Sequence, residues 1–91
     1  MYYVYILLSK RDKKFYTGCT NNLKDRIKRH NRGQISTTKN RRPLYLIYYE
    51  ACLNKDDAYK REKYLKTAWG KRYIKNRLKN FLINQGKCYT I

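Results

Sequence analysis

The chain has 91 residues, enough for one domain with a single modest core, and its eleven tyrosines and 42% hydrophobic content exclude a disordered basic tail. Its 23 lysines and arginines outnumber six acidic residues and give a formal net charge of +17. Such a charge opposes compaction unless a polyanion offsets it, so we expect nucleic acid as the partner. An anionic membrane surface is the weaker alternative, because no segment combines a Lys/Arg face with a Trp/Phe/Leu face.

The cysteines and the apolar segments favour a cytoplasmic protein. Cys19, Cys52 and Cys88 contain no CxxC pair, which argues against a zinc ribbon or a disulfide framework and fits reduced thiols. A nucleophilic pair of Cys19 with His30 is a minor alternative. The first apolar segment, residues 2–8, is too short for a signal peptide core with its flanks or for a membrane span. We therefore expect no membrane association.

The first two elements are predicted to be strands that pair as an antiparallel hairpin. Residues 2–8 and 15–18 are rich in tyrosine and aliphatic or β-branched residues, and the charged segment SKRDKK connects them. The two-residue period of a strand places Tyr3 and Tyr5 on one face and Val4 on the other.

A helix and a third strand follow. Residues 20–33 read as a helix with Thr20 or Asn21 as its N-cap and Gly33 at its end. After a polar loop, residues 44–50 form a run that is apolar throughout, as expected of a strand covered on both faces.

The second half of the chain is predicted to be helical. Asn54 is the expected N-cap of a helix over residues 54–69, and Gly70 separates this helix from a last one over residues 71–84.

The predicted order is β-β-α-β-α-α, and the fold class is α+β, with helices gathered around a small antiparallel sheet. We expect a single domain over residues 1–84 and a loose tail over residues 85–91.

Two candidate site residues lie on the first helix. Arg26 and His30 share a face with Leu23 and Ile27, so they flank the buried stripe. A guanidinium held there can clamp a phosphate or stabilise a pentavalent transition state. His30 lies one turn from Arg26, so both can reach a common ligand, which suggests a role in proton handling or at a metal-bound water. A structural hydrogen bond is the alternative for this histidine.

Glu62 is the candidate metal ligand. It lies between Ala58 and Leu65 on a stripe that is expected to turn inward and to include Ala68. A carboxylate in that position needs a cation beside it. The cation is either a neighbouring Lys or Arg, or a divalent metal such as Mg²⁺ held by one carboxylate, waters and substrate phosphate. This helix alone leaves both interpretations open.

The tyrosines of the hairpin also allow two interpretations. Tyr3, Tyr5 and Tyr16 are either cross-strand packing partners or part of an active site. Nearby cations would favour a phenolate, which could orient or deprotonate a water. Gly18 would let backbone and substrate approach closely at the end of the strand.

The joint pattern resembles the GIY-YIG nuclease superfamily. The tripeptides YVY, residues 3–5, and YTG, residues 16–18, resemble the two halves of its motif. The segment NNLKDRIKRHN resembles the helix with the family arginine, and AYKREKYLK resembles the helix with the metal-binding glutamate. The resemblance spans roughly residues 2–75 and is closest to small stand-alone members related to the nuclease end of the bacterial excinuclease C subunit. The chain departs from it by reading TAWGKRYIKN where many relatives carry a Pro-x-Tyr-Asn segment.

The resemblance implies a three-stranded antiparallel sheet with a cleft that hydrolyses phosphodiester bonds in DNA, in a structure-selective or repair-related role. In that cleft Glu62 would hold Mg²⁺ or Mn²⁺, which stabilises the leaving oxygen. Tyr5 would activate or position the water with help from Tyr16 or His30, and Arg26 would steady charge on the phosphate.

The remaining basic residues are expected to bind the nucleic-acid backbone without reading its sequence. The expected phosphate contacts are Lys39, Arg41, Arg42, Lys71, Arg72 and Lys75. The main rival is a nucleic-acid-binding module that uses the fold without efficient cleavage, and a ribosomal RNA-binding accessory is a third possibility. Neither needs an inward acid such as Glu62. RNA as the substrate, a partner protein for targeting and the oligomeric state stay open.

Overall fold

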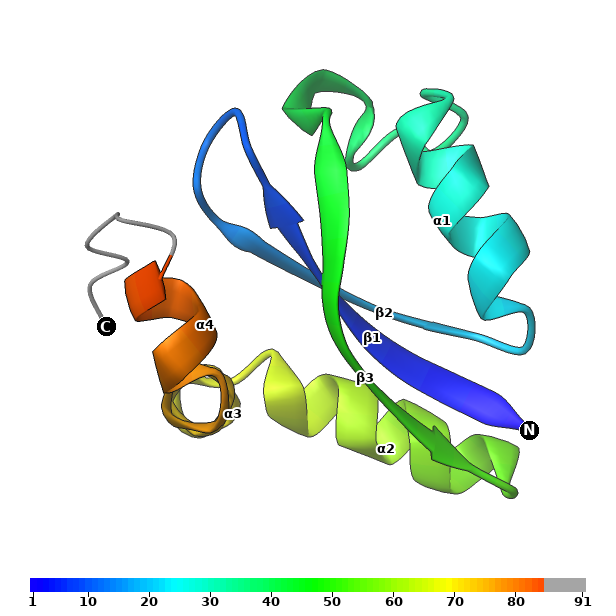
Figure 1. Cartoon of the computed structure of the whole chain (residues 1–91). Coiled ribbons are helices and arrows are strands. Elements are labelled where there is room, and N and C mark those ends of the chain that lie inside the picture. The colour runs from blue at the N-terminus through cyan, green and yellow to red at the C-terminus, as the bar shows by residue number, and fades with distance from the viewer. Residues whose placement is uncertain (85–91) are drawn as a thin grey trace.

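The computed structural model describes residues 1–84 as three strands and four α-helices (Figure 1). The predicted tail, residues 85–91, lies outside the described residues. The elements are β1 (Tyr2–Ser9), β2 (Phe15–Thr20), α1 (Leu23–Asn31), a short 3₁₀ turn η1 (Lys39–Arg41), β3 (Leu44–Cys52), α2 (Lys55–Leu65), α3 (Ala68–Arg77) and α4 (Lys79–Asn84). The strands form one antiparallel sheet in the order β2-β1-β3, which confirms the predicted α+β class and the hairpin.

The central strand β1 separates two layers of core. Val4 and Ile6 pack with residues of α2 and α3, whereas Tyr5 and Leu7 pack with Leu44 and the inner side of α1. Figure 1 shows α1 on one side of the sheet and α2 to α4 on the other. The alternation expected from the two-residue period of a strand is therefore present.

The prediction for the third strand was wrong in one respect. Leu44 is buried, but most of β3 is exposed or half-buried, with Tyr49 52% exposed. The strand lies at an edge of the sheet, and the nine residues of α1 cover only part of its face. An apolar sequence does not distinguish a central strand from an edge strand. The exposure of its side chains is decided by the position of the strand in the sheet.

The helix boundaries also differ in detail from the prediction. Asn22, not Thr20 or Asn21, is the N-cap of α1 and accepts a hydrogen bond from the Asp25 amide. Gly33 has a φ of +78° just beyond this helix, which confirms it as the stop signal. Asn54 caps α2 as predicted, because its side-chain oxygen accepts hydrogen bonds from the backbone amides of residues 56 and 57.

Gly70 does not separate two helices. It lies in the first turn of α3, where a Cβ would come within 2.2 Å of the Tyr64 carbonyl oxygen, so it permits close packing of α3 on the end of α2. The break falls instead before Thr67, which caps α3. Ala68 is consequently exposed rather than inward, and the predicted last helix is divided at Leu78 into α3 and α4. No helix within residues 1–84 is long and apolar enough to cross a membrane.

Candidate active site

Tyr5 lies at the centre of the candidate site, fully buried in the middle of β1. Its backbone partner on β2 is Gly18. A Cβ atom on Gly18 would lie 2.4 Å from the Tyr5 hydroxyl oxygen, closer than real contacts allow. The Tyr5 ring therefore crosses β2 where the strand has no side chain. Gly18 was expected to allow close approach of backbone and substrate, and in the structure the group closest to it is the Tyr5 phenol.

His30 holds Tyr5 through a buried hydrogen bond. Its Nε2 lies 2.8 Å from the Tyr5 hydroxyl oxygen, and its Nδ1 lies 2.7 Å from Oγ1 of Thr38. Both ring nitrogens thus bond within the protein, which places His30 behind Tyr5 instead of at a ligand shared with Arg26. Burial, and then the positive charges of Arg26 and Arg29, lower the pKa of His30 to about 4. The imidazole is therefore neutral at pH 7.

Tyr5 is a protonated phenol at neutral pH. Burial raises its pKa to about 12, and the neighbouring Tyr16 and Glu62 act in the same direction. The Arg26 guanidinium lowers this pKa, but by less than burial raises it. The sequence-based expectation of a phenolate was wrong because the loss of hydration in the core outweighs the nearby cations.

Arg26 of α1 lies beside the Tyr5 hydroxyl with an unused donor. Its Nε atom is buried and has no hydrogen-bond partner within residues 1–84. An unpaired buried donor costs roughly 1–3 kcal/mol, so such groups are uncommon in folded proteins. An oxygen of a bound phosphate would satisfy it.

Glu62 of α2 contributes the negative charge of the site. It lies close enough to Tyr5 for its charge to raise the pKa of the phenol. Its side chain is only 17% exposed, and its Oε2 lies 3.1 Å from Nζ of Lys66, one helical turn further on. The carboxylate therefore has the lysine partner of one interpretation, and its position near Tyr5 is compatible with the other, a divalent-metal ligand.

Tyr16, near the start of β2, completes an aromatic cluster. Its ring centroid lies 6.4 Å from that of Tyr5 and 5.1 Å from that of His30. The His30 ring stands edge-on to both tyrosines, at 69° to Tyr5 and 64° to Tyr16. Three rings from β1, β2 and α1 thus fix one another.

The donors around Tyr5 fit a divalent metal held by one carboxylate. Within residues 1–84, no three His, Cys, Asp or Glu side chains gather into a metal-binding group. A site on Glu62 would therefore use a single protein carboxylate, which suits Mg²⁺ because this ion keeps several waters and binds substrate phosphates. Lys66 is 54% exposed, and an ion pair this accessible contributes little to stability. A metal ion could therefore displace the lysine from Glu62 at little cost.

Cys19 does not fit the minor alternative of a nucleophilic pair. It is a free thiol whose pKa is raised, mainly by burial, so the thiolate is disfavoured. His30, the base it would need, bonds to Tyr5 and Thr38 instead. Cys88 lies outside the described residues.

The six predicted phosphate contacts fall into different environments. Arg41 binds Asp12 and donates to the carbonyls of Lys14 and Phe15, so it holds the β1–β2 hairpin loop. Lys39 and Arg42 are exposed beyond the end of α1, and Arg42 donates to the Lys39 carbonyl.

The other three contacts are on α3. Lys71 lines a small pocket beside Tyr16, and the guanidinium of Arg72 stacks on Trp69 at 5.1 Å from the ring centroid. Lys75 is half-buried. The structure therefore places exposed cations both beyond the end of α1 and close to Tyr16, and it assigns Arg41 a structural contact.

Two residues of the site escaped sequence reasoning. Thr38, which bonds His30, comes from a loop without periodicity, and no local pattern marks it. Lys66 is four residues after Glu62, and this i, i+4 spacing on a helix was a usable signal.

Comparison with known families assigns the protein to a class. The profile of the GIY-YIG catalytic domain matches residues 1–75, most of the chain. The chain therefore belongs to the GIY-YIG family, a family of nucleases, which confirms the resemblance seen in its motifs.

Individual relatives are small proteins of similar extent. The chain is 51% identical over 67 residues to a UPF0213 protein of Clostridium perfringens, covering 72% of this chain and 71% of the relative. It is 41% identical over 81 residues to a UPF0213 protein of Pediococcus acidilactici, covering 82% of each. It is 45% identical over 67 residues to a UPF0213 protein of Staphylococcus haemolyticus, covering 72% of this chain and 80% of the relative. No solved structure matches the chain significantly.

Proposed function

We propose that this protein is a divalent-metal-dependent endonuclease that hydrolyses phosphodiester bonds in DNA and selects its substrate by structure, as a repair enzyme does. The observation that carries the proposal is the buried hydrogen-bonded chain of Tyr5, His30 and Thr38 beside Arg26 and Glu62. Packing alone does not require a neutral histidine behind a phenol, nor an unpaired guanidinium donor beside it. Membership of the nuclease family supports the same conclusion.

Tyr5 positions the attacking water in this proposal. In this proposal His30 carries its proton on Nδ1 and donates it to Oγ1 of Thr38, which leaves Nε2 to accept a hydrogen bond from the Tyr5 hydroxyl, and the 2.7 Å and 2.8 Å distances allow this arrangement. The lone pair of the Tyr5 oxygen then faces the site and accepts a hydrogen bond from the water. Because the phenol is neutral, it orients the water without repelling the phosphate.

The remaining residues handle charge and orientation. Arg26 is half-buried, and its guanidinium would donate to the phosphate oxygens, where negative charge grows in the transition state. Glu62 would hold Mg²⁺ or Mn²⁺, and the bound ion would supply positive charge at the leaving oxygen. Tyr16 packs on Tyr5 and His30 and keeps both rings in place.

The test is cleavage of a labelled panel of single-stranded, duplex, flap and branched DNA and of RNA. The panel is run at low salt with Mg²⁺, with Mn²⁺ and with EDTA. We expect metal-dependent cleavage that falls by at least about 10²-fold in Tyr5→Phe and in Glu62→Gln, because each removes a group at the reacting phosphate. Tyr59→Phe, which alters an exposed tyrosine of α2, is the matched control and should keep full activity.

The opposite result favours the rival function. Binding of these nucleic acids without cleavage in either metal, unchanged by Tyr5→Phe, would leave the protein as a nucleic-acid-binding module. Cleavage of RNA alone would move the substrate from DNA to RNA. Activity that appears only on addition of a second protein would indicate a targeting partner.

A further inference from the structure

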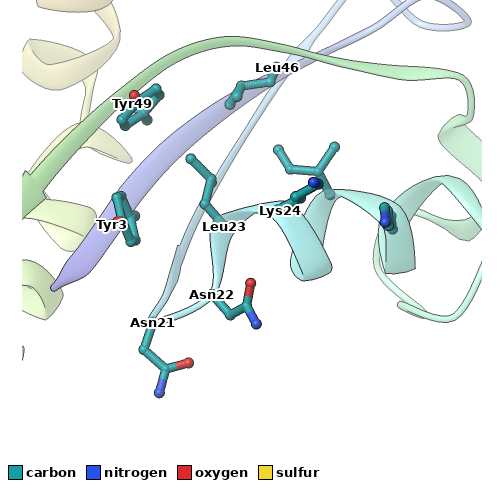
Figure 2. Close-up of a pocket in the computed structure, with 9 residues that line it drawn as sticks. Tyr3, Asn21, Asn22, Leu23, Lys24, Leu46 and Tyr49 are labelled. Carbon is teal, nitrogen blue, oxygen red and sulfur yellow. The ribbon is translucent and has the colours of Figure 1, made fainter.

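A groove lies on the α1 side of the sheet that the proposed chemistry does not use. It has a volume of about 610 Å³, within the usual range of ligand pockets, and runs between α1 and the face of β1 and β3 (Figure 2). It exists because α1 is too short to cover β3, which leaves Leu46 38% and Tyr49 52% exposed. In Figure 2, Leu23 points from α1 toward Leu46 and Tyr49. We call this feature the Tyr3–Tyr49 groove.

Two tyrosine rings form one wall of the groove. The centroids of Tyr3 and Tyr49 lie 5.9 Å apart with the ring planes at 63°, an edge-to-face pair. An edge-to-face pair leaves the face of one ring available to a third aromatic group. Stacking of a nucleobase on such a ring is tolerant of sequence, because every base has a π-face.

The polar residues of the groove suit an anionic ligand with hydrogen-bonding edges. Lys24 and Lys28 of α1 line it, and none of its lining residues is acidic. Asn21 and Asn22 also line it, and Asn22 uses its Oδ1 for the helix cap, which leaves its amide NH₂ to donate. A second copy of a chain with a net charge of +17 is disfavoured here by repulsion, whereas nucleic acid is attracted.

The groove adjoins the proposed catalytic tyrosine. Tyr3 is two residues before Tyr5 on the same face of β1, and Tyr49 is the β3 partner of Tyr5. Two strand residues span about 7 Å, which is roughly two stacked base steps. A base in the groove would thus belong to a nucleotide close to the phosphate at Tyr5.

We infer that the Tyr3–Tyr49 groove binds an unpaired nucleobase of the nucleic-acid substrate. This inference deepens the proposed nuclease function and rests on it for the role of the bound base in cleavage. A base within a duplex has its faces covered by its neighbours, so only an unpaired or extruded base can stack on Tyr49. The substrate class is therefore nucleic acid with an unpaired nucleotide beside the phosphate that is cut.

Equilibrium binding in EDTA tests the groove separately from cleavage. Fluorescence anisotropy is measured on a labelled single strand, the same strand with abasic nucleotides, and its duplex. We expect Tyr49→Ala to weaken binding of the intact single strand by about tenfold and to leave the abasic strand unaffected. Tyr49→Phe, which keeps the ring, should bind like the unsubstituted protein.

Tyr45→Ala is the matched control. Tyr45 is on the same strand and is similarly exposed, 49% against 52% for Tyr49, but it lies outside the groove. Its substitution should change binding of the single strand by less than about twofold. Circular dichroism of each variant checks that the fold is retained.

The outcomes separate the groove from the chemistry. Equal weakening by Tyr45→Ala and Tyr49→Ala, or equal affinity for intact and abasic strands, overturns the inference even if Tyr5-dependent cleavage is present. Base-dependent binding lost in Tyr49→Ala supports the groove even if no cleavage occurs, and then the nuclease proposal fails alone.

Discussion

Tyr5 and His30 share one hydrogen bond, and burial keeps each of them in its neutral form. A phenol in water loses its proton more readily near cations, and an imidazole in water is partly charged near neutral pH. Both tendencies are overridden here, because both rings are fully buried and ionising either one would place a charge in the core. In the proposed mechanism, the neutral pair orients a water without attracting or repelling the phosphate strongly.

The depressed pKa of His30 predicts a loss of stability in mild acid. The pKa falls from 6.5 to about 4 on folding, so the unfolded chain binds the extra proton between these values. The contribution to folding is complete above about pH 6.5 and is lost as the pH falls toward 4, by up to about 3 kcal/mol. Urea unfolding at several pH values between 7 and 4 measures this slope.

His30→Gln provides the comparison for that slope. The variant should be less stable than the unsubstituted protein at pH 7, because the bonds to Tyr5 and Thr38 are disturbed. Its free energy of unfolding should also fall less steeply toward pH 4. Parallel slopes in the two proteins would mean that His30 titrates normally.

At the scale of the elements, the pairing of β1 with β2 builds the site, and the shortness of α1 opens the groove. The register places Gly18 opposite Tyr5, so the phenol crosses β2 at a position without a side chain. The order β2-β1-β3 then leaves β3 at the other edge, where the nine-residue helix α1 covers only part of it. One sheet thus holds a buried aromatic cluster beside β2 and an open aromatic face on β3.

Gly18→Ala should disable the site through this register. The new Cβ would lie 2.4 Å from the Tyr5 hydroxyl oxygen and 2.5 Å from its Cζ, so the buried ring must move. We expect a loss of about 1–3 kcal/mol in stability and a fall in cleavage of about 10²-fold, because a displacement near 1 Å misaligns the water. Thermal unfolding and the cleavage panel measure the two effects.

Gly33→Ala separates misalignment from general destabilisation. Gly33 has a φ of +78°, so alanine there is strained, yet the nearest side chain is the flexible end of Arg42. This variant should lose about 1 kcal/mol in stability and keep most of its cleavage. If both alanine variants lost cleavage in proportion to stability, the alignment argument would fail.

Over the whole molecule, positive charges far outnumber the acidic residues that could pair with them. Within residues 1–84 the ion pairs involve three of the six acids, Asp12, Glu50 and Glu62. Arg61 of α2 binds Glu50 of β3, and Arg41 binds Asp12 in the β1–β2 loop. These two arginines therefore stabilise the fold. The net charge of +17 attracts a polyanion to the surface.

Salt dependence should tell the two kinds of cation apart. Affinity for DNA is expected to fall steeply with salt, and Lys71→Ala should reduce the slope of log K against log salt by about one, because it removes a phosphate contact. Arg41→Ala should lower the melting temperature and leave that slope unchanged, because its guanidinium already binds Asp12. Anisotropy titrations between 50 and 200 mM salt measure both slopes. A slope that changes with Arg41 and not with Lys71 would reverse the assignment.

The sequence by itself determined the local elements and the candidate residues. The two-residue period and the turn between residues 8 and 15 were enough for the hairpin, and the helix start at Asn54 could be read from its cap. The joint pattern of the two tripeptides and the two helices with Arg26 and Glu62 was enough to indicate the family, because these motifs occur in a fixed order along the chain. Such features depend on residues close together in the sequence, so they can be predicted without the tertiary structure.

The tertiary structure alone decided the exposure of β3, the contact of His30 with Thr38 and the protonation of Tyr5. Each depends on groups brought together from distant parts of the chain. An apolar run does not show whether its strand lies at an edge, and a count of nearby cations does not show how much water a phenol has lost. The burial of a group depends on all the residues that surround it, and these come together only when the chain folds.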